Sequence, residues 1–299
     1  MTPEHDEAPP IPGPDRHPRR PALVLPPGSC DCHAHVFGPA ARFPYSTPRS
    51  YTPPDSTLAE YLAMHDTLGV QRGVLVQPSV YGTDNSAMMD ALHAHPERLR
   101  GVAVLAPDVP EAELDALHAG GVRGLRVNVL FKGGVPISAA RPLAERIAAR
   151  GWHVQFLIDV GNHPELDREL AGFPAPVVID HMGHCAVAKA PTDPGFAALM
   201  RLLDTGRCWV KLSGPYRITA RQAVPFDDVA PVARTLVRRR PDRMVWGTDW
   251  PHPSIATAMP NDADLVEMLA DWVPDADTRR RILVDNPAEL YDFPGLAAG

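Results

Sequence analysis

The sequence predicts an α/β fold, a (β/α)8 barrel, and three observations support this prediction. Eight short apolar runs alternate with longer amphipathic stretches, as in repeated βαβ units. Titratable residues gather where several of these runs end, and the active sites of such barrels lie at the carboxyl ends of the strands. The sequence contains no glycine-rich dinucleotide-binding loop, so an open doubly wound sheet is the alternative rather than the first choice.

The expected elements follow one another in a regular order. Each apolar run is bounded by Gly, Pro or Asp and has the length of a strand. The expected strands are residues 29–37, 72–78, 100–107, 122–129, 153–159, 176–182, 208–214 and 243–249. Helical patterns lie between them and run up to Gly or Pro, which commonly end helices. The clearest are residues 58–69, 112–121, 138–151 and 229–241.

The chain is expected to have one folded domain and a tail. Residues 1–22 are rich in proline and charge and lack hydrophobic periodicity, so we expect them to be disordered. Residues 23–299 are expected to form a single domain, because barrels of this length commonly fold as one unit. Hydrophobic residues make up 44% and charged residues 22% of the chain, which is ordinary for a globular protein with a large core.

Charge and hydropathy exclude several partners. The net charge of −7 argues against nucleic acid or an anionic membrane, and an anionic ligand would need a local basic cluster. No apolar run approaches the ~20 residues that cross a bilayer, and the first residues lack the apolar segment of a secretory signal. Four cysteines in so long a chain do not suggest a disulfide scaffold. We expect a cytoplasmic protein with reduced thiols, either a monomer or a homodimer.

The first expected strand carries the stretch CDCHAH. Side chains alternate between the two faces of a strand, which puts Asp31, His33 and His35 on one face and Cys30 and Cys32 on the other. We expect the thiols to pack outward against the helices as small hydrophobic groups. The two histidines would then face the mouth of the barrel, where imidazoles bind a metal or a substrate.

The last expected strand ends in the stretch WGTDWPHP. In a closed barrel this strand neighbours the first one, so Asp249 would face His33 and His35. A carboxylate in that place serves as a metal ligand or as a general base for water. His181 ends the sixth strand, whereas Asp180 has the opposite parity and is expected to be structural.

A local basic cluster is expected near the same mouth. Arg126 and Asn128 share one face at the end of the fourth strand, where a buried arginine needs an anionic partner. Lys132 and Arg217 follow the fourth and seventh strands in loops that overhang the site. A salt bridge to a neighbouring loop is the alternative for Arg126, and solvation is the alternative for each of the other two.

Four further histidines receive no catalytic role. His163 and His184 are expected to be surface residues of loops, and His153 and His252 lie near the site region without an assigned role. The expected site therefore rests on the histidines of the first and sixth strands.

Several stretches resemble a known family. The motifs CDCHAHVFG, IDHMG, VKLSG, WGTDWPHP and NPAELYDF occur in order between residues 28 and 294. Together they resemble the lactonases and decarboxylases of the amidohydrolase superfamily, which are (β/α)8 barrels. The stretches FGPAARFPYSTPRSYTPPD, VLVQPSVYGTDN, RGLRVNVLFKGG and SGPYRIT are most similar to its lactonases of aromatic-acid catabolism that act on 2-pyrone-4,6-dicarboxylate.

The resemblance implies roles for particular residues. It implies that the catalytic residues around the scissile lactone are His33, His35, His181 and Asp249. It implies that the substrate's carboxylates and carbonyl are held by Tyr51, Ser79, Arg126, Lys132 and Arg217. These lactonases work without an obligatory metal, so none is expected here.

Two departures from the wider superfamily bear on metals and substrate. The fourth strand lacks the bridging lysine or glutamate of binuclear members, and the fifth ends in Asp159 rather than in histidine. A two-metal site is therefore not expected, whereas one Zn or Mn ion on His33, His35 and Asp249 stays open. Lys132 stands where the resemblance leads us to expect arginine, and lysine cannot bind a carboxylate in the same bidentate way.

Three functions are compatible with these residues. The first is hydrolysis of a small anionic lactone by water that Asp249 activates. The second is a metal-dependent lactone isomerase or decarboxylase that acts on a related sugar acid or muconate. The third is a non-catalytic binding protein on the same scaffold, which the inward histidines and Asp249 make the least favoured.

Overall fold

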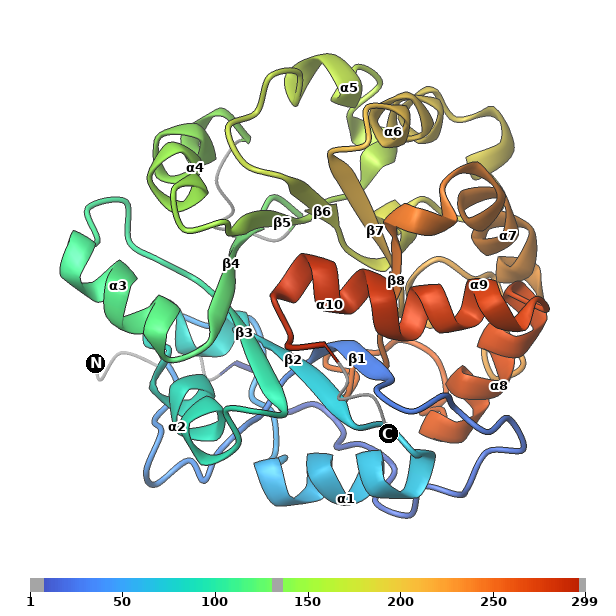
Figure 1. Ribbon diagram of the computed structural model, residues 1–299. Coiled ribbons are helices and arrows are strands. Elements are labelled where there is room, and N and C mark those ends of the chain that lie inside the picture. The colour runs from blue at the N-terminus through green and yellow to red at the C-terminus, as the bar shows by residue number, and fades with distance from the viewer. Residues whose placement is uncertain (1–7, 131–136, 296–299) are drawn as a thin grey trace, which may run out of the picture.

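Eight parallel strands form the barrel that the sequence predicts, with helices around it (Figure 1). The computed structural model describes residues 8–130 and 137–295. The strands pair in chain order and are β1 (Cys30–Ala34), β2 (Arg72–Val76), β3 (Leu99–Ala103), β4 (Val122–Asn128), β5 (His153–Leu157), β6 (Val177–Ile179), β7 (Cys208–Leu212) and β8 (Met244–Trp246). Most are shorter than predicted, because the polar residues that follow them leave the sheet to build loops.

The barrel closes at the carboxyl ends of β1 and β8. The amide of Asp249 donates to the carbonyl of His33 over 2.8 Å, and the amide of His35 donates to the carbonyl of Trp250 over 2.7 Å. Gly247 permits this approach, since a Cβ there would lie 2.7 Å from the His33 nitrogen. The closure excludes the alternative of an open doubly wound sheet. It also brings the stretch CDCHAH next to the stretch WGTDWPHP.

The helices form the outer layer. They are α1 (Leu58–Leu68), α2 (Ser86–Ala94), α3 (Glu111–Ala119), α4 (Arg141–Ala148), α5 (Leu166–Glu169), α6 (Pro194–Asp204), α7 (Ala230–Arg239), α8 (Asp262–Trp272), α9 (Ala276–Arg280) and α10 (Asn286–Tyr291). Helix α1 illustrates why they begin and end where they do. Thr57 and Glu60 form a capping box at its start, and Gly69 ends it in the left-handed conformation.

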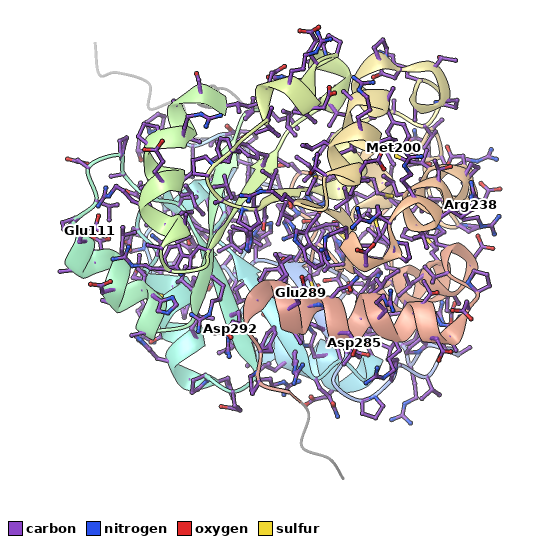
Figure 2. All side chains as sticks on the ribbon, turned by 45° about the horizontal axis from the view of Figure 1, so that its top comes forward. Glu111, Met200, Arg238, Asp285, Glu289 and Asp292 are labelled. Atoms are coloured by element: carbon purple, nitrogen blue, oxygen red, sulfur yellow. The ribbon has the colours of Figure 1, made fainter. Side chains whose placement is uncertain are left out.

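Helix α10 covers the amino ends of the strands. It crosses this end of the barrel in Figure 1, and the chain after it hydrogen-bonds to β2 and β3. Glu289 of this helix and Asp285, just before it, are exposed (Figure 2), whereas Leu290 and Tyr291 are buried. One side of this short helix therefore serves as the floor of the barrel.

The two thiols of the opening motif lie inside the barrel, so the prediction that they pack outward is wrong. Cys30 and Cys32 are fully buried in an apolar cluster with residues of other strands and of α10, among them Val74, Trp209 and Tyr291. The pairing of β1 with β2 shifts in register between residues 31 and 34. Simple alternation fails there, and both the thiols and the histidines face inward.

Asp31 faces outward, opposite to the prediction that it shares a face with the two histidines. One of its carboxylate oxygens accepts from the hydroxyl of Thr248 over 2.6 Å and from Tyr61 of α1 over 3.3 Å. The other accepts from the amide of Thr248 over 2.9 Å. Asp31 therefore ties β1 to α1 and to the chain after β8.

Residues 8–22 differ from the expected disordered tail. The amide of Arg19 donates to Asn261 over 3.1 Å, and its guanidinium pairs with Glu267 of α8 over 2.8 Å. Pro10 forms a bridge with Thr52. Side-chain contacts to the barrel thus order a segment that has no periodicity of its own. Residues 1–7 lie outside the described residues, and the domain boundary at residue 23 stays a prediction.

Candidate active site

A cavity of about 340 Å³ opens at the carboxyl ends of the strands. Seven of the nine predicted site residues line it: His35, Tyr51, Ser79, Arg126, His181, Arg217 and Asp249. His33 is fully buried next to it, and Lys132 lies outside the described residues. The geometry therefore gathers the predicted residues in one place, and their catalytic and binding roles stay predictions.

Asp249 lies among the three predicted histidines. Its Oδ1 is 3.6 Å from Nε2 of His33 and 3.6 Å from Nε2 of His35. Its Oδ2 is 3.9 Å from Nε2 of His181. All four side chains are buried, so the carboxylate faces imidazoles rather than bulk water.

Unusual backbone conformations direct these side chains. Among the described residues, seven other than glycine have positive φ, and six of these lie in residues 181–184 and 249–254. His181 has φ 48° and Asp249 has φ 64°. Left-handed conformations cost free energy in side chains of this kind and concentrate at functional sites. Here they turn His181 and Asp249 back over the end of the barrel.

Arg217 and Tyr216 hold the second oxygen of Asp249. Arg217 Nη2 is 2.6 Å from Oδ2, and the hydroxyl of Tyr216 donates to the same oxygen over 2.8 Å. Burial alone would raise the pKa of Asp249, but the positive charge of Arg217 outweighs burial and holds it well below its usual value. Asp249 is therefore a carboxylate throughout the neutral range.

This contact changes the reading of Arg217. Its guanidinium pairs with Asp249 and also donates to the carbonyl of Pro253 over 3.2 Å, so much of its hydrogen-bonding capacity is used within the protein. Sequence reasoning missed Tyr216, although it directly precedes Arg217 in the quoted stretch SGPYRIT. The hydrophobic pattern of that loop does not distinguish the role of Tyr216 from that of Arg217.

The histidines are neutral. Burial, followed by the charge of Lys211, lowers the pKa of His33 to about 4. Burial also lowers the pKa of His35, and it lowers that of His181 well below its usual value. The Nδ1 of His35 lies 2.7 Å from the carbonyl of Val76, which can only accept, so Nδ1 carries the proton and Nε2 of His35 bears a lone pair.

A buried polar layer lies beneath the histidines. Lys211 of β7 is fully buried, and its Nζ donates to the carbonyl of Cys32 over 2.8 Å and to Oε1 of Gln155 over 2.7 Å. Its third partner is Nδ1 of His33, at 3.3 Å. Nε2 of Gln155 donates to Oδ2 of Asp180 over 3.0 Å, which leaves Oδ1 of Asp180 3.6 Å from Nζ.

Asp180 faces the barrel, so the prediction from its parity is wrong. Strand β6 ends at Ile179, one residue earlier, and the left-handed His181 then turns the chain. Both Asp180 and His181 therefore reach the site. Sequence analysis missed Lys211, because the stretch VKLSG was used only for the family resemblance. Lys211 lies two residues after Trp209 on β7 and therefore shares its inward face.

The spacing of these groups is compatible with one metal ion. The ligand atoms of His33, His35 and Asp249 lie within 4.8 Å of one another, as do those of His33, Asp180 and His181. Nε2 of His33 and Oδ1 of Asp249 are buried and form no hydrogen bond with the described residues. The hydrogen bonding does not fit an ion, however. With Lys211 donating to Nδ1, a neutral His33 carries its proton on Nε2 and has no lone pair there.

Arg126 is a second arginine that lines the cavity. Its Nη1 donates to the carbonyl of Gln77 over 2.8 Å, and no described carboxylate forms a salt bridge with it. Ser79 and Tyr51 also line the cavity, and burial raises the pKa of Tyr51. The wall thus offers a guanidinium and two neutral hydroxyl groups to a ligand.

Two of the histidines left without a role lie near the site. His184 is half-buried with its ring centroid 5.1 Å from that of His181, and burial lowers its pKa to about 3, so its prediction as a surface residue is wrong. The left-handed turn at residues 181–184 folds it inward. His252 is fully buried, with Nδ1 2.9 Å from the hydroxyl of Tyr216. His163 lies outside the site and contacts Glu169 over 2.9 Å.

Comparison with known proteins adds the family. The sequence model of the amidohydrolase family matches residues 30–293. The 2-pyrone-4,6-dicarboxylate hydrolase of Comamonas testosteroni is 39% identical over 285 residues, covering 92% of this chain and 93% of the relative. The 4-sulfomuconolactone hydrolase of Hydrogenophaga intermedia is 38% identical, with 93% of each chain covered.

A further relative and a solved structure agree with this placement. The D-galactarolactone isomerase of Agrobacterium fabrum is 30% identical, covering 93% of this chain and 96% of the relative. A crystal structure of a probable 2-pyrone-4,6-dicarboxylic acid hydrolase from Acinetobacter baumannii with citric acid bound has a TM-score of 0.78 at 28% identity. It covers 89% of this chain and 100% of that one. The chain therefore belongs to the amidohydrolase family of enzymes, together with these lactone hydrolases.

Proposed function

We propose that the protein hydrolyses a small carboxylated lactone, similar to 2-pyrone-4,6-dicarboxylate, in the breakdown of aromatic acids. One observation carries the proposal: an ionised, buried Asp249 faces neutral imidazoles at the edge of a cavity that also exposes Arg126. A volume of about 340 Å³ suits a single small ring. Both relatives at 38% and 39% identity are named as lactone hydrolases, which supports the same reaction class.

The proposed reaction is an acyl transfer to water. Asp249 accepts a proton as a water oxygen attacks the lactone carbonyl, and a tetrahedral intermediate forms. His181, which lines the cavity, stabilises the developing oxyanion. The ring C–O bond then breaks, and the proton held by Asp249 passes to the departing ring oxygen. Because the pKa of Asp249 is low, proton transfer accompanies bond formation rather than preceding it.

The substrate's carboxylates are proposed to bind away from Asp249. Arg126 offers a guanidinium, and Tyr51 and Ser79 offer hydroxyl groups. Lys132 is proposed to complete this cluster, as the family resemblance implies. The structure of the Acinetobacter protein with citric acid bound supports a site for polycarboxylates. Such contacts position the ring and supply proximity rather than bond chemistry.

No metal is proposed as obligatory. If one Zn or Mn ion were bound, His33, His35 and Asp249 would hold it, and it would polarise the carbonyl as a Lewis acid. The hydrogen bond between Lys211 and His33 argues against that arrangement.

The test is a panel of carboxylated pyrones, muconolactones and sugar-acid lactones, assayed with and without a chelator. The proposal expects opening of at least one lactone, with release of one acid equivalent and no effect of the chelator. Failure to hydrolyse any of them would contradict it. Zinc lost together with activity would favour a metal-dependent enzyme.

A lactone isomerase is the second candidate, and the relative from Agrobacterium fabrum supports it. Product analysis separates the two, because an isomerase yields a second lactone and releases no acid.

Two expectations about the protein's surroundings belong to the same proposal. No helix among the described residues is long and apolar enough to cross a membrane. A cytoplasmic location and a monomeric or homodimeric state stay predictions, which cell fractionation and light scattering would test.

A further inference from the structure

Lys211 is a charged side chain that the proposed reaction does not use. It lies in the middle of β7 and is fully buried inside the barrel, near the aromatic ring of Tyr291. A buried lysine is costly unless its donors are satisfied and its charge is balanced. Both conditions are met here, because Asp180 lies 3.6 Å from Nζ and three acceptors surround it.

The donors of Lys211 can be counted. An ammonium group has three N–H bonds, and the carbonyl of Cys32 and Oε1 of Gln155 take two of them. The third reaches Nδ1 of His33 at 3.3 Å. The orientation of the Gln155 amide agrees with this assignment, since its nitrogen donates to Asp180 and leaves its oxygen for Lys211.

Asp180 does not compete for Nδ1 of His33. The two groups lie 3.3 Å apart, but Oδ1 of Asp180 accepts no hydrogen bond from any described residue. The pair is close without being aligned for donation. Asp180 therefore balances the charge of Lys211, and the hydrogen bond at Nδ1 of His33 is the one with Lys211.

We propose that Lys211 is a positioning residue that fixes the proton of His33 on Nε2, which makes the site bind a water molecule in place of a metal ion. A neutral imidazole that accepts at Nδ1 carries its hydrogen on Nε2. That hydrogen then points toward the space shared with Asp249 and His35. This inference rests on the proposed function and names the group that prepares its attacking water.

The three atoms around this space are complementary to water. Oδ1 of Asp249 and Nε2 of His35 lie 3.6 Å apart, and each can accept a hydrogen bond from a water molecule. The Nε2–H of His33 donates to one of its lone pairs. The second lone pair is left to attack the carbonyl carbon. Three polar partners are typical of a well-ordered buried water.

The hydrogen bond from Lys211 distinguishes this chain from a metal enzyme that has the same three ligands. Without Lys211, His33 would be free to carry its proton on Nδ1 and to present a lone pair at Nε2. The three ligand atoms within 4.8 Å would then match the donor set of a single zinc ion.

The first measurement is the tautomer of His33 in ¹⁵N-histidine-labelled protein, assigned through a His33→Gln variant. Wild-type protein is expected to give the Nε2–H signature for His33. Lys211→Met together with Asp180→Asn removes both charges at once and protects folding, and it is expected to lose that signature. Lys189→Met, at an exposed lysine, is the matched control and should leave it unchanged.

The second measurement is zinc affinity, by competition with a chromophoric chelator. The double variant is expected to bind one zinc at least about tenfold more tightly than the wild type, the size of effect that second-layer partners have on metal sites. Its metal-free kcat is expected to fall about 100-fold, with little change in KM. Lys189→Met should change none of these values.

The outcomes separate the two proposals. An Nδ1–H signature in the wild type, or unchanged zinc affinity in a folded double variant, overturns the role of Lys211. The wild-type Nε2–H signature with increased zinc affinity in the variant supports that role even if no lactone is opened, and in that case only the proposed function fails.

Discussion

The two ends of the barrel interior are built from the same strands but have opposite chemistry. At the amino end, Cys30, Val74 and Trp209 pack with Tyr291 of α10 in an apolar cluster. At the carboxyl end, the strands lead into buried histidines and Asp249. Helix α10 covers the first end, whereas six of the seven described residues other than glycine that have positive φ lie at the second.

The contrast teaches how the fold separates stability from chemistry. Apolar burial at the floor needs no particular hydrogen bond, so it tolerates substitutions of similar volume. The carboxyl end depends on the orientation of each proton and lone pair, because an unpaired buried group is costly. Lys211 joins the two regions: its ammonium group satisfies the polar layer, and it lies 6.0 Å from the ring of Tyr291.

The largest expected effect is at the carboxyl end. Asp249→Asn is expected to lower kcat by about 1,000-fold or more, because the amide cannot take the proton from water. Substrate binding should change little by comparison, measured by titration of the inactive variant with lactone, and thermal unfolding checks that the variant is folded. Near-normal turnover in this variant would remove Asp249 from the mechanism.

The opposite effect is expected at the floor. Tyr291→Ala should reduce the free energy of unfolding by about 3 kcal/mol, because it opens a cavity in the apolar cluster. The kcat/KM should stay close to the wild-type value. Tyr291→Phe is the matched control and should be near neutral, since the buried hydroxyl has no hydrogen-bond partner among the described residues. A large fall in the kcat/KM of folded Tyr291→Ala would show that the two ends are not independent.

Acid should destabilise the carboxyl end. His33 has a folded-state pKa of about 4, below its unfolded value of about 6.5, so the unfolded chain binds the proton more readily. Stability is therefore full above pH 6.5 and decreases as the pH falls toward 4, by up to about 3 kcal/mol for this residue. Urea unfolding across this range measures the effect. A His33→Gln variant should show a shallower slope, and an identical slope would contradict the assignment.

A smaller effect is expected at the wall of the cavity. Arg126→Lys keeps the charge but loses the planar guanidinium, so KM for a carboxylated lactone should rise about tenfold with little change in kcat. An uncharged lactone should be affected much less, and equal losses for both substrates would argue against a carboxylate partner for Arg126.

Much of the fold could be predicted because it depends on local patterns. Alternating apolar runs and amphipathic stretches located all eight strands, and the parallel order followed from the helices between them. The position of Asp249 beside His33 also followed, because the first and last strands of a closed barrel are neighbours.

The errors occurred where tertiary contacts override local rules. Alternation from inward histidines placed Cys30 and Cys32 outside, but a register shift between residues 31 and 34 lets the thiols and the histidines both face inward. The prolines of residues 8–22 suggested disorder, whereas Arg19 holds that segment against α8. Neither the shift nor the ion pair leaves a periodic signal in the sequence.

The amino-acid sequence alone predicts the barrel, its family resemblance and the residues that gather at its mouth, because these depend on hydrophobic periodicity and motif order. The tertiary structure alone decides the electrostatic state of those residues. Arg217 pairs with Asp249, and Lys211 reaches His33 across the barrel from β7. Protonation and hydrogen bonding depend on distances between atoms far apart in the chain, and no local pattern encodes those distances.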